Sequence, residues 1–457
     1  MANVIDPYSV PERGRSVQEG NSLVSNSFLP GASTVMPDSL QLPSAETGTL
    51  NLYERLFSTN RFPSRRLASV DGFRAITLFL MIFVNNLWSL YKIPSWLGHA
   101  GEMEDRLGLA DTVAPAFLFI VGLSIPFALQ ARQARGYSKK STFLHILSRS
   151  IALLVMGIFQ CNLDSYDTTR ALIAKPWWQI GITLAFFLIW LDYPSSVSQK
   201  NKKVLRGLGI FLLTTLAILF RGNFDGHASW MQADWYGTLG VIGWSYLIGA
   251  SIYLFIGDRL GVFAGIFVAC VFLNMANMSG WLDSLNHLKS YVWLLDSGDL
   301  IAFTMAGIMT SGLYRQVTRE GQTEQGILVL ATLVLILMGA GIALRPFWGI
   351  SKERDTASWI LICTAISIAA YIILLYLMDL KGRKSWTHSI RPASTSTLTC
   401  YLLPYIHNAI LNLCGSSANL PLFLRTGTVG ILKSLLYAWV IIRIAGWLEK
   451  KGFRLSL

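Results

Sequence analysis

Apolar residues run along this chain in blocks of about twenty, and short polar segments separate the blocks. A helix of about twenty residues crosses a hydrocarbon core of roughly 30 Å. The pattern therefore predicts an all-α integral membrane protein, a polytopic bundle of about 10–12 transmembrane helices. The candidate spans cover residues 74–91, 109–130, 143–161, 177–191, 204–220, 236–256, 259–277, 299–315, 325–345, 357–378, 396–413 and 422–446.

The first 62 residues do not follow this pattern. They are rich in Ser, Pro, Asn and Gly and contain no apolar stretch typical of a signal peptide. We predict that residues 1–62 form a disordered cytoplasmic N-terminal tail and that residues 63–457 form one transmembrane domain.

Composition agrees with a membrane protein and indicates its orientation. Of the 457 residues 53% are hydrophobic and 14% are charged, and the net charge is +12. In a soluble protein this charge would suggest nucleic acid, but here the cations cluster in alternate loops, as the positive-inside rule requires. We predict a multi-pass protein of the plasma membrane, in contact with lipid and not with nucleic acid, with both termini cytoplasmic. The cationic loops follow the spans that end near residues 130, 191, 315, 378 and 446, and residues 61–66 precede the first span.

The opposite loops contain few cations and several tryptophans, which we interpret as an aromatic belt at the membrane interface, with sugar stacking as the alternative. These residues are Trp177, Trp178, Trp230, Trp235, Trp281 and Trp293. The five cysteines and six histidines follow no metal-binding spacing, so we predict no metal site.

Polar residues at membrane depth mark candidate sites, because they are costly without a partner. The first span carries Asp71 and Arg74 near its start and the amides Asn85 and Asn86 near its end. Adjacent helical residues point about 100° apart, so at most one amide faces the bundle interior squarely. Either amide could form an interhelical hydrogen bond that stabilises packing, or could contact a substrate.

The loop between the first two spans contains His99, which an outer carboxylate could orient. Neutral imidazole is well matched to proton abstraction near pH 7, and a carboxylate beside it would stabilise the imidazolium. A solvated loop histidine with no catalytic role is the alternative. The charged neighbours of His99 are Glu102, Glu104, Asp105, Arg106 and Asp111.

The order of these residues resembles the signature of the heparan-α-glucosaminide N-acetyltransferase family, as a bacterial-type member with a DUF5009-like pattern. The run S-V-D-G-F-R-A starts at Ser69, F-V-N follows, then His99 with Ala100, then A-D-T-V-A-P-A-F-L-F-I-V-G-L-S-I. The chain departs from the family at Ala75, where glycine is usual, and at Ala114, where an aromatic residue is usual. Motif positions are occupied by Asp71, Arg74, Asn85, His99, Asp111, Pro115 and Gly122.

The resemblance implies that residues 63–457 are a transmembrane acyltransferase domain. Such an enzyme would move an acetyl group from cytoplasmic acetyl-CoA to an amino sugar or glycan acceptor on the extracytoplasmic side, without a metal. It implies that His99 is the catalytic histidine and makes a homodimer possible. The family's N-terminal extracytoplasmic domain is absent here, so we expect a bacterial inner-membrane protein whose acceptor need not be heparan sulfate.

The remaining candidate residues are assigned by their predicted side of the membrane. Arg74 and Arg149 lie at cytoplasmic helix ends, where their guanidinium groups could bind CoA phosphates or could simply anchor the helices. Asp71 is assigned to the cofactor site with them. We assign catalysis to His99, Asn85 and Asp111, and contact with the acceptor to Asn86, Glu102, Lys352 and His407. Lys352 could instead extend to the interface, and His407 could have a packing role.

The main alternative function is a secondary transporter of amino sugars or related metabolites, since transporters also bind solutes through buried Asn, Asp and His. The sequence shows no strong internal repeat and no matched pair of broken spans, which disfavours this reading. A non-catalytic membrane scaffold is the third possibility.

Overall fold

The computed structural model describes residues 67–457 apart from 225, 234, 236, 286–297, 319–322 and 416–420. All of these residues belong to one structural unit, Thr49–Leu457. The predicted tail, residues 1–62, and Trp293 lie outside the described residues.

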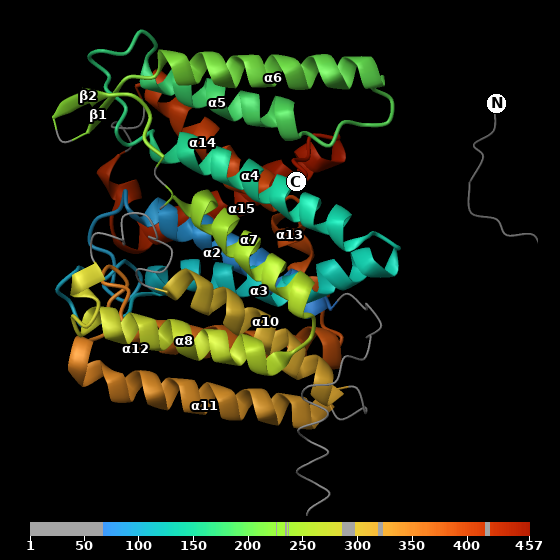
Figure 1. Ribbon diagram of the computed structural model, residues 1–457. Helices are drawn as coiled ribbons and strands as arrows, with labels where there is room; N and C mark the ends of the chain where they lie inside the picture. Colours follow the sequence, from blue (N-terminus) through green and yellow to red (C-terminus); the bar gives the residue numbers. More distant parts are fainter. Residues whose placement is uncertain are drawn as a thin grey trace, which may run out of the picture. The chain divides into compact units, whose positions relative to one another are not determined.

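Each predicted span corresponds to a long helix in the described part of the chain (Figure 1). By length and composition, eight of these helices could cross a membrane: α2, α3, α4, α7, α8, α11, α12 with its continuation, and α15. The protein is therefore an all-α polytopic membrane protein, as the sequence predicts. The long helices are α2 (Ala68–Leu87), α3 (Leu109–Ala134), α4 (Lys139–Cys161), α5 (Lys175–Trp190), α6 (Gln199–Leu219), α7 (Thr238–Ile256), α8 (Leu260–Met278), α10 (Asp299–Thr318), α11 (Thr323–Trp348), α12 (Ala357–Leu374), α14 (Thr397–Leu413) and α15 (Gly427–Lys450).

Several short elements connect the long helices. The strands β1 (Gly222–Phe224) and β2 (His227–Ser229) form a small antiparallel hairpin that the hydrophobic pattern does not predict. A π-helical turn, η3 (Leu375–Leu380), continues α12. The others are α13 (Pro392–Thr395) and the 3₁₀ turns η1 (Asp283–Leu285), η4 (Ser385–Ile390) and η5 (Leu422–Arg425).

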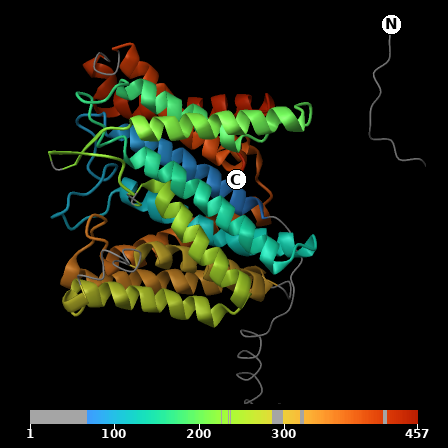
Figure 2. The same cartoon turned by 45° about the horizontal axis from the view of Figure 1, so that its top comes forward.

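Helix α3 lies in the middle of the bundle and packs against α2, α7, α10 and α12. In both views α5 and α6 lie at one edge, α8, α11 and α12 lie at the other, and α2 and α3 lie between them (Figures 1 and 2). Two glycines let α3 and α10 approach closely, because a Cβ at Gly122 would lie 2.0 Å from the carbonyl oxygen of Thr304. A Cβ at Gly307 would lie 2.0 Å from the carbonyl oxygen of Phe119. Small residues at a membrane helix interface permit this contact.

Helix α2 begins at Ala68, six residues before the predicted start of the first span. The two oxygens of the Asp379 carboxylate accept the backbone N–H groups of Ala68 (3.0 Å) and Ser69 (3.1 Å). These donors have no partner inside the helix, and an anion at this end interacts favourably with the helix dipole. Because Asp379 lies in η3, far away in the sequence, local pattern does not reveal the true start.

The described tryptophans predicted to form an interfacial belt differ in exposure, and Trp235 is intermediate. Trp177, Trp230 and Trp281 are exposed on the described surface, as an interfacial residue should be. Trp178 is fully buried, and its ring packs against Phe159, Tyr166 and Phe220, so the prediction of an interfacial position is wrong there. Its indole N–H donates to the carbonyl of Leu216 at 2.9 Å, which satisfies the one polar group that burial would otherwise strand.

Candidate active site

The loop between α2 and α3, residues 88–108, holds His99 close to the start of α3. Gly108 is the N-cap of α3, and a Cβ at this position would lie 1.8 Å from the carbonyl oxygen of Gly98. No residue larger than glycine fits there without moving the backbone of the loop. The loop therefore turns back on itself immediately beneath His99.

His99 and Asp111 form the central pair of the site. The distance from Nδ1 of His99 to Oδ1 of Asp111 is 2.7 Å, and the side chains are 23% and 1% exposed. The other oxygen of Asp111 accepts the backbone N–H groups of Ala100 and Gly108, each at 3.0 Å. With four lone-pair sites, a carboxylate can accept all three donors together. The structure thus brings together two of the three residues predicted to be catalytic.

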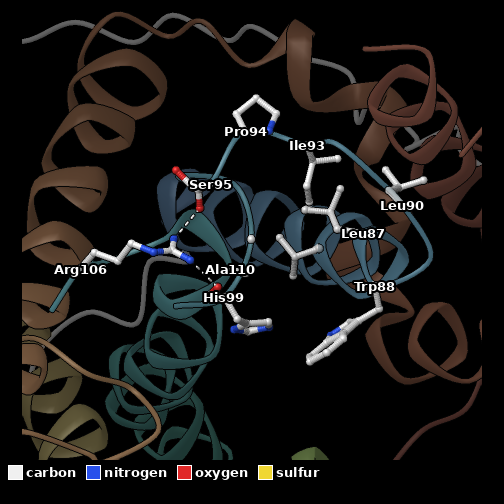
Figure 3. Close-up of a pocket in the computed structure, with 11 residues that line it drawn as sticks. Leu87, Trp88, Leu90, Ile93, Pro94, Ser95, His99, Arg106 and Ala110 are labelled. Carbon is white, nitrogen blue, oxygen red and sulfur yellow. Dashed lines mark hydrogen bonds between the residues drawn. The ribbon is translucent and has the colours of Figure 1, made fainter. Parts of the chain in front are cut away.

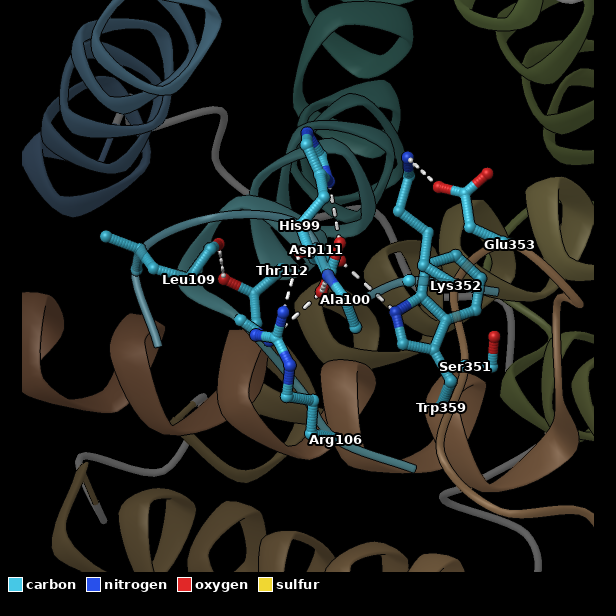
Figure 4. A network of polar contacts seen from close by, with 12 residues as sticks. His99, Ala100, Arg106, Leu109, Asp111, Thr112, Ser351, Lys352, Glu353 and Trp359 are labelled. Atoms are coloured by element: carbon cyan, nitrogen blue, oxygen red, sulfur yellow. Dashed lines mark hydrogen bonds and ion pairs between the residues drawn. The ribbon is translucent and has the colours of Figure 1, made fainter. Parts of the chain in front are cut away.

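Helix α12 supports the same site from the other side. The indole N–H of Trp359 donates to the backbone carbonyl of Asp111 at 3.2 Å, so α12 contacts the first turn of α3 directly beneath the imidazole (Figure 4). Trp359 is buried and its ring meets that of Phe303 edge to face. A rigid support of this kind keeps the carboxylate in place for the histidine.

Arg106 organises the loop from inside. Its guanidinium donates to the carbonyl of Ser95 at 2.6 Å and to the carbonyl of His99 at 2.9 Å (Figure 3). Its Nε donates to the carboxylate of Glu104 at 2.7 Å. The N–H of Gly101 and then the guanidinium of Arg106 hold the pKa of the Glu104 carboxyl below its ordinary value. Arg106 therefore holds two backbone segments of the loop at once.

Asp105 connects the loop to the segment between α11 and α12. Its carboxylate accepts the backbone N–H of Ile350 at 2.7 Å and the guanidinium Nε of Arg345 at 2.9 Å. The N–H of Ile350 and, to a smaller extent, Arg345 hold the pKa of the Asp105 carboxyl below its ordinary value. We call this set of contacts the Asp105 latch. The local sequence pattern does not reveal this latch, because Asp105 and Arg345 are separated by 240 residues.

A pocket of about 290 Å³ opens beside His99 (Figure 3). Most of its lining is apolar and comes from the end of α2 and from the loop, while Ser95, His99 and Arg106 supply the polar part. The ring of Trp88, 78% exposed, lies with its centre 5.6 Å from the imidazole centre. The space around the imidazole is thus concave, accessible and bordered by an aromatic face.

The adjacent amides of α2 face different surroundings. The side-chain carbonyl of Asn86 accepts the hydroxyl of Ser434 in α15 at 2.8 Å, which is an interhelical hydrogen bond. Asn85 is exposed, and within the described chain no hydrogen bond joins it to His99. It lies three residues before Trp88, on the same helix face as the ring that packs against His99. The structure therefore places Asn85 near the site without bringing it into contact with His99.

Asp71 and Arg74 lie in the first two turns of α2. Arg74 donates to Asp71 at 3.4 Å and to the hydroxyl of Ser124 in α3 at 2.7 Å. Both charged side chains remain about a quarter exposed, at 25% for Arg74 and 28% for Asp71. Arg149 lies elsewhere, in a second pocket bordered by α4, α5 and α6. The three residues predicted to bind the acetyl donor are therefore divided between two places.

The residues predicted to contact the acceptor are dispersed. Lys352 pairs with Glu353 at 3.3 Å, and in Figure 4 its side chain projects to the same side as that of His99. Glu102 is exposed in the loop. His407 lies between α14 and α15, where its Nδ1 is 3.2 Å from the hydroxyl of Tyr437. Within the described residues, no group of three or more His, Cys, Asp or Glu side chains is placed to hold a metal ion.

The fold and the site together place the protein in a class. It is a polytopic membrane protein with a candidate acid–base site, in which a carboxylate supports a histidine in a loop at one end of the helix bundle. Residues 66–303 match the family described as "Domain of unknown function (DUF5009)", and the chain belongs to that family. The matched residues include His99 and Asp111 and exclude Lys352 and His407.

Two curated relatives carry an informative name. The chain is 33% identical over 158 residues to the mouse protein named "Heparan-alpha-glucosaminide N-acetyltransferase", a match that covers 31% of this chain and 22% of the relative. It is 41% identical over 101 residues to the human protein of the same name, covering 21% of this chain and 14% of the relative. The chain thus matches less than a quarter of the length of either relative. The family resemblance drawn from residues 66 to 129 is confirmed.

Proposed function

We propose that this protein is a membrane-bound acetyltransferase that moves an acetyl group from cytoplasmic acetyl-CoA to an amino sugar or glycan on the extracytoplasmic side. The observation that carries the proposal is the pair of His99 and Asp111, 2.7 Å apart, within the segment that matches the family. The similarity to proteins named as N-acetyltransferases supports the reaction class. The cation-rich alternate loops support the orientation.

The hydrogen bonds around Asp111 determine which nitrogen of His99 would act as the base. One carboxylate oxygen already accepts two backbone N–H groups, and the other is 2.7 Å from Nδ1 of His99. In the neutral imidazole Nδ1 therefore carries the proton and donates a hydrogen bond to the carboxylate, which leaves Nε2 with a free lone pair. This is the arrangement in which an imidazole accepts a proton from a substrate while a carboxylate stabilises the resulting cation.

The proposed reaction begins with an acceptor amine, or hydroxyl, beside Nε2 of His99. The acceptor atom bonds to the acetyl carbonyl carbon while its proton moves to Nε2. The bond from carbon to sulfur then breaks, and the proton on His99 returns to the departing thiolate of CoA. The side chain of Asn85 would donate a hydrogen bond to the carbonyl oxygen as negative charge develops there. In a variant of the reaction Nε2 of His99 first bonds to the acetyl carbon while the bond from carbon to sulfur breaks and the CoA thiolate leaves. The acceptor then takes the acetyl group from the imidazole and gives its proton to Nε2, from which the proton passes to the thiolate.

The geometry of the pocket beside His99 supports an acceptor that is partly apolar. An exposed aromatic face such as that of Trp88 can cover the apolar face of a sugar ring, while Arg106 and His99 provide polar contacts at the edge. Lys352, which projects to the same side, would attract an anionic glycan. The proposed acetyl transfer does not require the possible homodimer.

The proposal is tested with purified protein in proteoliposomes that have acetyl-CoA on one side only and glucosamine on the other. We expect acetylated glucosamine to form when acetyl-CoA is on the side that carries the N-terminus. Uptake or counterflow of the amino sugar without acetylation would instead establish the transporter alternative. A protein that does neither under conditions where it binds acetyl-CoA would contradict both readings.

A further inference from the structure

A second pocket, of about 280 Å³, lies between α4, α5 and α6 at the opposite ends of the helices from His99. His145, Ser148 and Arg149 project into it from one face of α4, at the spacing of successive helical turns. Arg206 of α6 lines the pocket on the opposite side. The end of α5, with Ser456 and Leu457, forms the rest of its wall. We call it the α4–α6 pocket. Its lining side chains include two guanidinium groups and an imidazole but neither Asp nor Glu; Leu457, the last residue of the sequence, also carries a terminal carboxylate.

The two arginines are held in position by aromatic rings. The guanidinium of Arg149 lies 4.9 Å from the ring centre of Tyr246, and that of Arg206 lies 5.9 Å from the ring centre of Tyr193. Contact with a ring face orients a guanidinium without neutralising it. Among the described residues no carboxylate is ion-paired with either arginine, so their charge remains available to a ligand.

The position of Arg149 within α4 also favours a role in ligand binding. It lies ten residues after the first residue of the helix, or about 15 Å along the axis, inside a candidate membrane span. Arg149 is exposed on the helix surface. A cation within a spanning helix is costly unless it faces a polar cavity, and it commonly marks a ligand pathway. Simple anchoring at the interface would be served equally well by Lys139 and Lys140, at the start of the same helix.

We propose that the α4–α6 pocket binds a phosphate ester through Arg149, Arg206 and His145. Guanidinium groups bind phosphate oxygens in a bidentate manner, and Ser148 adds a hydroxyl donor. Two sources share this chemistry: the phosphates of CoA, and the headgroup of an anionic lipid. The CoA source rests on the proposed function; the phosphate site itself does not. His145, Ser148 and Arg206 are then ligand contacts beyond those named above.

The test measures equilibrium binding to the full-length protein in a neutral detergent. The probes are CoA, dephospho-CoA and a short-chain phosphatidylglycerol, each with wild type, Arg149→Gln and Arg206→Gln. Because a charge-assisted hydrogen bond contributes about 1.5–3 kcal/mol, each substitution should weaken the preferred probe roughly ten- to a hundredfold. Arg206 is on the exposed surface of α6, so its replacement should not impair folding, and melting in detergent verifies this. Arg443→Gln is the matched control, since Arg443 is exposed and also lies 5.9 Å from a ring centre, that of Trp439.

Each outcome has a definite meaning. Tighter binding of CoA than of dephospho-CoA, weakened in both variants, assigns the pocket to the acetyl donor. Binding of phosphatidylglycerol alone, weakened in both variants, assigns it to lipid and supports the phosphate site. Unchanged affinity for every probe in both variants overturns the inference. Acetyl transfer is measured in parallel on the same samples, so that loss of the phosphate site with intact transfer, or the reverse, separates this inference from the proposed function.

Discussion

Nδ1 of His99 lies 2.7 Å from one carboxylate oxygen of Asp111, whose side chain is 1% exposed, and the other oxygen of the same carboxylate accepts two backbone N–H groups. The pair joins a loop residue to the first turn of α3, so the position of the imidazole depends on the helix rather than on the loop alone. This dependence makes Asp111 a separate target for mutation.

Replacing Asp111 with Asn keeps the size of the side chain and removes its charge. The amide offers only one acceptor atom where the carboxylate has two, so Nδ1 of His99 loses its anionic partner and the imidazole can adopt the other tautomer. We expect kcat to fall on the order of a thousandfold, as loss of an orienting carboxylate can cause. Steady-state acetyl transfer provides the measurement. Thr112→Val, one residue away, is the control and should retain most of the activity; equal losses in both variants would indicate damage to folding.

The adjacent amides Asn85 and Asn86 should respond in opposite ways. Asn86→Ala removes the hydrogen bond to Ser434, so we expect a loss of stability of about 0.6–1.7 kcal/mol and nearly normal turnover. Asn85→Ala should leave the melting temperature unchanged and lower kcat about a hundredfold, as loss of one donor to a developing oxyanion does. Melting and kinetics measured on both variants distinguish these roles. Normal turnover in Asn85→Ala would remove this residue from the site.

The helices of this fold can be predicted from sequence, and the contacts between them cannot. Blocks of apolar residues reveal each span, because lipid requires the same length of apolar helix every time. They do not show that Asp379 extends the start of α2 or that Trp178 lies in the core, since both depend on residues distant in sequence. Periodicity also treats Trp177 and Trp178 alike, although only the former is exposed.

Part of the candidate site can likewise be predicted from the sequence, and part of it cannot. The motif around His99 and Asp111 can be predicted from the sequence, because both residues lie within one short segment whose polar residues are unusual beside two apolar spans. The Asp105 latch and the α4–α6 pocket cannot be predicted from the sequence. The latch joins residues 240 positions apart, and the pocket combines residues of three helices. The position of Arg149 at a cytoplasmic helix end and its guanidinium group predict a role in binding CoA phosphates, and this stays a prediction.

The Asp105 latch should depend on pH. Hydrogen bonds from Ile350 and Arg345 lower the pKa of the Asp105 carboxyl in the folded protein, so the latch contributes stability above the unfolded pKa of about 4. This contribution is lost as the pH falls from about 4 through the lower folded pKa. We expect labelling of a cysteine placed at Ala100, which is 5% exposed in the loop, with a reagent suited to acid to increase over that range. In Asp105→Asn labelling should already be high at neutral pH and should change little with pH.

A double-mutant cycle measures the ion pair within the latch. Both partners are nearly half exposed, so we expect a coupling free energy of about 0.2–1 kcal/mol between Asp105→Asn and Arg345→Gln. The cycle is read from melting in detergent. Strictly additive single and double variants would show that the N–H of Ile350, rather than Arg345, holds Asp105.

The contact between α3 and α10 should not tolerate a methyl group. A Cβ at Gly122 or Gly307 would lie 2.0 Å from a backbone oxygen of the other helix, so the two backbones must separate. We expect Gly122→Ala and Gly307→Ala each to cost about 1–3 kcal/mol of stability, measured by thermal unfolding in detergent. Gly265→Ala in α8 is the matched control, because no atom lies within 4 Å of its Cβ position. It should be neutral or stabilising by up to about 1 kcal/mol.

The role of His99 as the base in acetyl transfer is tested by comparing wild type with His99→Ala in the same two assays. These are acetyl transfer from acetyl-CoA to glucosamine by purified protein, and equilibrium binding of CoA. Because the acceptor's proton would have no base to receive it, we expect His99→Ala to lose transfer by at least about a hundredfold while CoA affinity stays within about twofold of wild type. Transfer by His99→Ala at nearly the wild-type rate would contradict the account, because the imidazole beside Asp111 would then be dispensable.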